Sequence, residues 1–133
     1  MPEVKLKKIF RFSAAHYLPN HPKCGKIHGH NYKLEIVVRG KVNEETGMVI
    51  DFQELKDIVE KTVILYLDHQ FMNNRLKFIP TSENLVLWIY DRLAPEFFFK
   101  GLTLEKVVLW ETEKNCAIYC AGDKKEPKKE DIL

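Results

Sequence analysis

The chain lacks several features that mark large classes of proteins. It has only three cysteines, an odd number that excludes a complete disulfide framework and favours a reduced environment. Its net charge of +2 is too small to indicate binding to nucleic acid or to an anionic membrane. No run approaches the roughly 18 apolar residues of a membrane-spanning helix, and the first residues do not resemble a signal peptide. We therefore expect a cytoplasmic protein with neither nucleic acid nor membrane as partner.

What remains is the composition of one globular domain. The 133 residues are 45% hydrophobic and 30% charged, and they contain no internal repeat. A chain of this length can bury about two-thirds of its unfolded surface. The last twelve or so residues are rich in lysine and acidic residues and poor in apolar ones. We expect a single domain over residues 1–121, followed by a charged, flexible tail over residues 122–133.

Histidines occur in a pattern typical of a metal site. His28 and His30 are separated by one residue, so they point to the same side of an extended strand. His16, at the end of an earlier strand-like stretch, could supply a third nitrogen. Three neutral imidazoles around zinc leave the fourth tetrahedral position open, as in a catalytic site. Cys24 lies four residues before His28 and leaves a second possibility open, a closed structural site of three histidines and one cysteine.

The periodicity of the hydrophobic residues predicts the elements around these histidines. Alternation indicates strands, helical spacing indicates amphipathic helices, and Asp51, Thr81 and Ser82 are suited to cap helix starts. The predicted elements are strands over 4–16 and 28–42, helices over 51–66 and from 81 onward, and a hairpin over 102–121. The order is β-β-α-α-β-β, and the expected fold is α+β, with a four-stranded antiparallel sheet and two helices on one face.

Six motifs, in order along the chain, resemble those of the family of 6-pyruvoyl- and 6-carboxy-tetrahydropterin synthases. They are FSAAH (12–16), CGKIHGHNY (24–32), GMVIDFQELK (47–56), LDHQFMN (67–73), PTSENL (80–85) and WETEKN (110–115). The resemblance covers residues 8–121 and implies the tunnelling fold, assembled as a homohexamer of two stacked trimers with twelve-stranded barrels. Such an assembly would also pair the strand edges that a four-stranded sheet leaves open.

The resemblance implies a zinc enzyme. His16, His28 and His30 match the family's three zinc ligands, and Cys24 matches its catalytic cysteine, which removes a proton from the substrate. A thiolate can do this only if its pKa is lowered, for example by the nearby zinc charge. Without the resemblance, any one of these histidines could equally be an ordinary surface or core residue.

The resemblance also implies residues that relay protons and hold the substrate. Asp68 and His69 match an Asp–His pair that reaches the site from a neighbouring subunit; by themselves they could be no more than a helix end. Glu111 matches the carboxylate that anchors the pterin ring, although strand alternation alone would also allow it to face solvent. Thr81, Ser82 and Glu83 match the segment that helps to hold the pterin ring. Without the resemblance, they would indicate only the start of a helix.

The implied substrate is 7,8-dihydroneopterin triphosphate. Three residues separate Cys24 from His28, a gap that resembles the branch forming 6-carboxy-5,6,7,8-tetrahydropterin, acetaldehyde and triphosphate for the synthesis of deazaguanine bases such as queuosine and archaeosine. A 6-pyruvoyl-tetrahydropterin synthase, which releases triphosphate from the same substrate, is the alternative within the family. A zinc hydrolase of the same superfold and a non-catalytic, zinc-stabilised assembly protein are alternatives of other classes. Lys23 and Lys26 are candidates for contacts with the triphosphate.

Overall fold

The computed structural model describes residues 2–22 and 25–123. Lys23, Cys24 and residues 124–133 of the predicted tail lie outside the described residues. One sheet carries the fold, with its strands in the order β3-β1-β2-β4-β5. The strands are β1 (Glu3–His16), β2 (His28–Lys41), β3 (Gln70–Phe71), β4 (Thr103–Trp110) and β5 (Cys116–Cys120).

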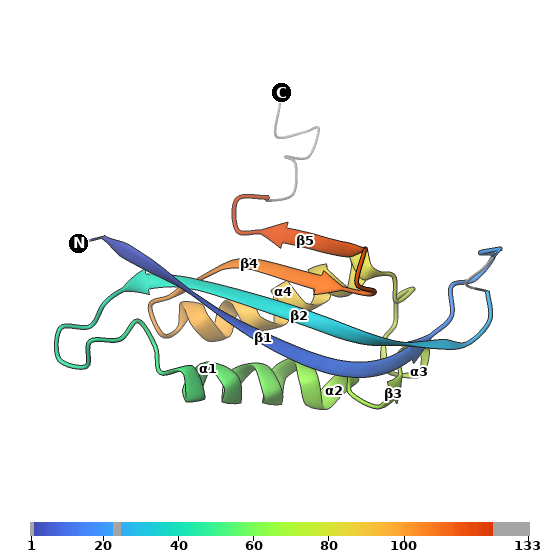
Figure 1. The fold of residues 1–133 in the computed structure, drawn as a ribbon, viewed down its shortest axis with the longest axis horizontal. Coiled ribbons are helices and arrows are strands. Elements are labelled where there is room, and N and C mark those ends of the chain that lie inside the picture. The colour runs from blue at the N-terminus through green and yellow to red at the C-terminus, as the bar shows by residue number, and fades with distance from the viewer. Residues whose placement is uncertain (1, 23–24, 124–133) are drawn as a thin grey trace, which may run out of the picture.

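The long antiparallel pair of β1 and β2 makes up most of the sheet (Figure 1). Their register runs from Glu3 opposite Lys41 to His16 opposite His28. Side chains alternate along both strands: the even-numbered positions are buried from Phe10 to His16 and from Tyr32 to Gly40, while His28 and His30 are half-buried and most odd-numbered positions are exposed or half-buried. The predicted strands are therefore confirmed, and the apolar stripe continues into the histidines.

The sheet has five strands rather than the four that the sequence predicted, and it is mixed rather than antiparallel. The additional strand, β3, runs parallel to β1 and pairs with Ala14 and Ala15. It is held by the preceding residues, because the His69 N–H donates to the Ser13 carbonyl at 2.6 Å and Asp68 Oδ1 accepts from the Ser13 N–H at 2.9 Å. Two residues are too few to show an alternating pattern, so this strand could not be predicted from hydrophobic periodicity.

Helices cover one face of the sheet, as predicted (Figure 1). The first helical stretch is interrupted by a π-helical segment and comprises α1 (Phe52–Val59), η1 (Glu60–Ile64) and α2 (Leu65–Leu67). A short α3 (Met72–Arg75) and the long α4 (Ser82–Phe98) follow. Asp51 caps α1 by accepting from the Gln53 N–H at 2.7 Å. Among the described residues, no helix combines the length and the apolar character needed to cross a membrane.

The core lies between these helices and the even-numbered side chains of the strands. Phe12, Leu34 and Leu109 from the sheet belong to the same buried cluster as Leu55 of α1 and Ile89 of α4. Near His16 and His28, the end of the sheet is contacted by the loop that leads into α4. In that loop, the Pro80 carbonyl lies beside the His16 ring. The fold thus places the histidines at one edge of the core.

Gly40 offers a test of the packing at the opposite end of β2. A Cβ added there would clash with the Leu102 side chain and lie 3.1 Å from Val49 Cγ1, and Leu102 is buried. We expect Gly40→Ala to lower the free energy of unfolding by about 1–3 kcal/mol, measured by chemical denaturation. Gly122→Ala is the control, because a Cβ there meets nothing within 4 Å. Equal stability of the two variants would contradict this packing.

Candidate metal centre and adjoining cavity

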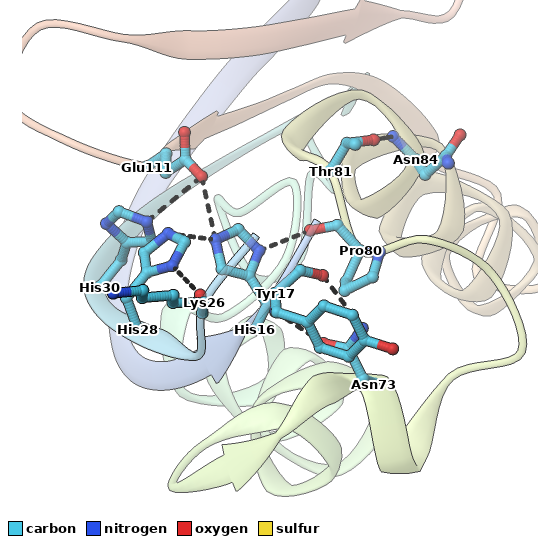
Figure 2. A network of polar contacts seen from close by, with 10 residues as sticks. All are labelled: His16, Tyr17, Lys26, His28, His30, Asn73, Pro80, Thr81, Asn84 and Glu111. Atoms are coloured by element: carbon cyan, nitrogen blue, oxygen red, sulfur yellow. Dashed lines mark hydrogen bonds and ion pairs between the residues drawn. The ribbon is translucent and has the colours of Figure 1, made fainter. Parts of the chain in front are cut away.

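Three histidines meet where β1 ends and β2 begins. His16, His28 and His30 each offer one ring nitrogen, and these atoms lie within 4.8 Å of one another. The ring centroids are 4.6 to 5.1 Å apart, in edge-on arrangements. His16 is fully buried, and the other two are partly exposed. Figure 2 shows His16 between Glu111 and Pro80, with His28 and His30 beside it.

The tautomers of two histidines are fixed by backbone carbonyls. His16 Nδ1 lies 2.8 Å from the Pro80 carbonyl, and His28 Nδ1 lies 2.8 Å from the Lys26 carbonyl. A carbonyl can only accept, so each Nδ1 carries the proton and each Nε2 has a lone pair. These two Nε2 atoms are 3.1 Å apart. Two neutral acceptors facing each other at this distance repel unless a cation or a proton lies between them.

Glu111 and His30 add further acceptors to the same place. Glu111 Oε1 lies 3.4 Å from Nε2 of both His16 and His30. His30 Nε2 is buried and has no hydrogen-bond partner among the described residues. Burial lowers the pKa of His30, the Glu111 carboxylate opposes this, and any positive charge on His16 or His28 would lower the pKa further. A neutral imidazole is the form that binds metal, so the donor set fits a divalent cation such as zinc.

A cavity of about 500 Å³ adjoins the histidines through Glu111. Ser82 and Glu83, at the start of α4, line it together with Glu111, and β5 supplies the opposite wall. The Ser82 hydroxyl is buried without a partner among the described residues. Thr81 has a different position, because its hydroxyl caps α4 by accepting from the Asn84 N–H at 3.1 Å. Of the predicted ring-binding segment, Ser82 and Glu83 therefore face the cavity.

Asp68 and His69 form a pair at a different place. His69 Nδ1 lies 3.1 Å from Asp68 Oδ1, and the His69 side chain is 82% exposed. Its backbone has a φ of 60°, in the left-handed region, and this turns the chain from α2 into β3. A second cavity of about 380 Å³ lies beside it and is also lined by His30. No contact in the described part of the chain joins His69 to the metal-site histidines of the same chain.

The structure adds one residue that sequence reasoning placed only in the apolar stripe. Tyr32 is 1% exposed, and its hydroxyl, like His30 Nε2 and Ser82 Oγ, is buried without a hydrogen-bond partner among the residues described. Burial raises the pKa of Tyr32, and the charge of Glu111 raises it further. Unpaired buried polar atoms are rare in folded proteins. Of the three, His30 Nε2 lies 3.4 Å from Glu111 Oε1 and Ser82 lines the same cavity as Glu111, which indicates that the region is built to receive a ligand.

The histidine cluster yields a direct test of metal binding. We expect His30→Ala to weaken zinc binding by more than about 100-fold, since loss of a direct ligand should exceed the effect of losing an outer contact. Zinc bound per chain would be measured by competition with a chromogenic chelator. His69→Ala is the matched control and should keep its zinc, because His69 does not contact the cluster. Retention of tight zinc binding by His30→Ala would show that the three histidines are not the metal site.

Known proteins of one family are similar to this chain in sequence and in fold. The family model described as 6-pyruvoyl tetrahydropterin synthase matches residues 5–121. A relative from Archaeoglobus fulgidus, provisionally named 6-carboxy-5,6,7,8-tetrahydropterin synthase, is 48% identical over 106 residues, which are 80% of this chain and 86% of the relative.

Two further proteins carry the pyruvoyl name. The 6-pyruvoyl tetrahydrobiopterin synthase of Dictyostelium discoideum is 41% identical over 101 residues, 73% of each chain. The structure of Caenorhabditis elegans 6-pyruvoyl tetrahydropterin synthase superimposes with a TM-score of 0.81 at 29% identity, over 92% of this chain and 98% of that one. With its fold, its histidine cluster and these similarities, the chain belongs to the 6-pyruvoyl tetrahydropterin synthase family, whose members are enzymes that act on pterins.

Proposed function

We propose that the protein is a zinc-dependent lyase that converts 7,8-dihydroneopterin triphosphate to 6-carboxy-5,6,7,8-tetrahydropterin, acetaldehyde and triphosphate, for the synthesis of deazaguanine bases. The observation that carries the proposal is the position of Glu111. One of its oxygens faces the metal-site histidines, and its carboxylate also lines the cavity beside them. A substrate bound at this carboxylate would have its side chain next to the metal.

The cavity suits a pterin ring. The edge of a 2-amino-4-oxo ring presents N–H donors, and Glu83 and Glu111 offer carboxylate oxygens that accept such hydrogen bonds. The apolar side chains of Val86 and Ile118 line the same cavity and can contact the faces of a flat ring. A pocket that combines apolar walls with a few placed polar groups is typical of small-molecule sites.

The roles of the reacting groups follow from their chemistry. Zinc, when held by the three histidines, would act as a Lewis acid on the hydroxyl oxygens of the substrate side chain. Cys24 would remove a carbon-bound proton as a thiolate. Asp68 Oδ1 lies 3.1 Å from His69 Nδ1, so it could hold the proton on that nitrogen and leave His69 Nε2 to take up and release a proton.

We further propose that His69 serves the metal site of a neighbouring subunit in a homohexamer of two stacked trimers. Its exposed side chain and its lack of contact with the histidines of its own chain support this. Both edges of the sheet are also suited to pairing: β3 covers only Ala14 and Ala15 of β1, and β5 has no further neighbour among the described strands. Ile9 and Ile118 on these edge strands are 48% and 53% exposed. Unpaired edges with exposed apolar residues commonly mark assembly surfaces.

The role of Cys24 separates the proposal from its alternatives. We expect Cys24→Ala to keep its zinc and its thermal stability but to lose at least about 100-fold in kcat, because the base is missing. Substantial remaining activity would favour a zinc hydrolase that uses bound hydroxide. Loss of zinc, with unfolding, would favour a structural site in which the thiol is a ligand.

Product analysis assigns the branch within the family. Zinc-loaded protein would be incubated without oxygen with 7,8-dihydroneopterin triphosphate, and the products identified by mass. We expect 6-carboxy-5,6,7,8-tetrahydropterin and acetaldehyde. Formation of 6-pyruvoyl-tetrahydropterin alone would support the alternative shared with the Dictyostelium discoideum relative by name, and absence of any turnover would contradict the proposed substrate.

Mixing two inactive variants tests whether a site is shared between subunits. If Cys24 and His69 of one site come from different chains, equal amounts of Cys24→Ala and His69→Ala, dissociated and reassembled together, restore about a quarter of the sites. Activity should then recover to roughly that fraction of the unmodified protein. Each variant dissociated and reassembled alone is the control. No recovery in the mixed sample, with mixed oligomers confirmed by mass, would show that both residues act within one chain.

A further inference from the structure

Tyr32 is the buried polar residue to which the proposed mechanism assigns no role. Its side chain is 1% exposed, and its hydroxyl has no hydrogen-bond partner among the described residues. Phenylalanine would fill almost the same space without leaving a buried hydroxyl unpaired, which is costly. A tyrosine at this position therefore indicates that the hydroxyl acquires a partner when the site is occupied.

The sheet places Tyr32 between an aromatic neighbour and Glu111. On the β1 side its ring stacks on Phe12, with centroids 4.9 Å apart and an interplanar angle of 9°. On the β4 side, Lys33 pairs with Trp110 and Leu34 with Leu109, so the same register extended by one residue sets Tyr32 opposite Glu111. Residues opposite each other in an antiparallel pair share a face and approach closely. Phe12 thus fixes the ring, and Glu111 is the neighbouring acceptor.

Glu111 has to change its contacts when the site fills. Its Oε1 now lies 3.4 Å from Nε2 of His16 and of His30, atoms that are directed at the metal position. Once those nitrogens bind a metal, they can no longer take up a proton and donate it to the carboxylate. To accept from two N–H groups of a ring, both carboxylate oxygens must be available to the cavity. A fixed donor beside Glu111 would favour that orientation.

We infer that Tyr32 is a positioning residue: its hydroxyl donates a hydrogen bond to the Glu111 carboxylate and holds it turned toward the cavity, away from the metal ligands. The inference rests on the proposed function, in which Glu111 binds the pterin ring. Tyr32 acts as a neutral phenol throughout and needs no change of protonation.

A double-mutant cycle tests the inference in the zinc-loaded, full-length protein. Tyr32→Phe, Glu111→Gln and the double variant would be compared for binding of neopterin, followed by its fluorescence, and for kcat and KM. We expect Tyr32→Phe to weaken binding about tenfold, as for loss of one hydrogen bond to a charged group, and to raise KM with little change in kcat. In the Glu111→Gln background the loss should be clearly smaller, because the amide oxygen of Gln is an uncharged and weaker acceptor. Tyr66→Phe is the control, because that hydroxyl bonds to the Arg75 carbonyl among the helices.

The outcomes separate this inference from the proposed function. Unchanged neopterin binding by Tyr32→Phe, or an equal loss with and without Glu111→Gln, would overturn the role of Tyr32 and leave the proposed function standing. If the unmodified protein binds no neopterin, the proposed function fails. The role of Tyr32 is then tested by the visible absorption spectrum of the cobalt-substituted protein. Tyr32→Phe should then alter the visible bands, since Glu111 is free to approach the metal, and the double variant should match Glu111→Gln alone. Bands unaffected by Tyr32→Phe would contradict the inference.

Discussion

The register between β1 and β2 is the constraint on which the rest of the site depends. It sets His16 opposite His28 and places His30 on the same face. A slip of one residue would turn one strand's histidines to the other face of the sheet. The buried side chains of Phe12, Leu34 and their neighbours oppose such a slip, because it would expose them. Packing of the core therefore also holds the three histidines in position.

The carbonyls of Pro80 and Lys26 complete this arrangement by fixing the tautomers of His16 and His28. With both Nδ1 atoms donating, the Nε2 lone pairs face each other across 3.1 Å, and Glu111 adds negative charge beside them. A protein that assembles acceptors in this way, without donors between them, has a site that only a cation or extra protons can stabilise. Glu111 lies between the metal position and the cavity. In the proposed function, a substrate bound by this carboxylate is therefore also next to the metal.

Much of this could be predicted from the sequence, because the signals are local. The alternation of hydrophobic residues predicted both long strands, and the spacing of His28 and His30 predicted that they lie on the same face. Two features depended on contacts between distant segments. Strand β3 has only two residues, and it forms through hydrogen bonds between Ser13 and the segment at Asp68 and His69. Tyr32 has the alternation of a core residue, and only the absence of a partner for its hydroxyl, among the residues described, distinguishes it. Neither property is encoded by the pattern of neighbouring residues.

X-ray absorption of the zinc-loaded protein tests the central claim most directly, because it reports the atoms bound to the metal without requiring substrate. An open site held by His16, His28 and His30 predicts three imidazole nitrogens at about 2.0 Å, with any further ligand a light atom and no sulfur. A sulfur atom at about 2.3 Å would show that Cys24 is a ligand and that the site is closed and structural. Fewer than three imidazoles would show that the register of β1 and β2 does not define the metal centre.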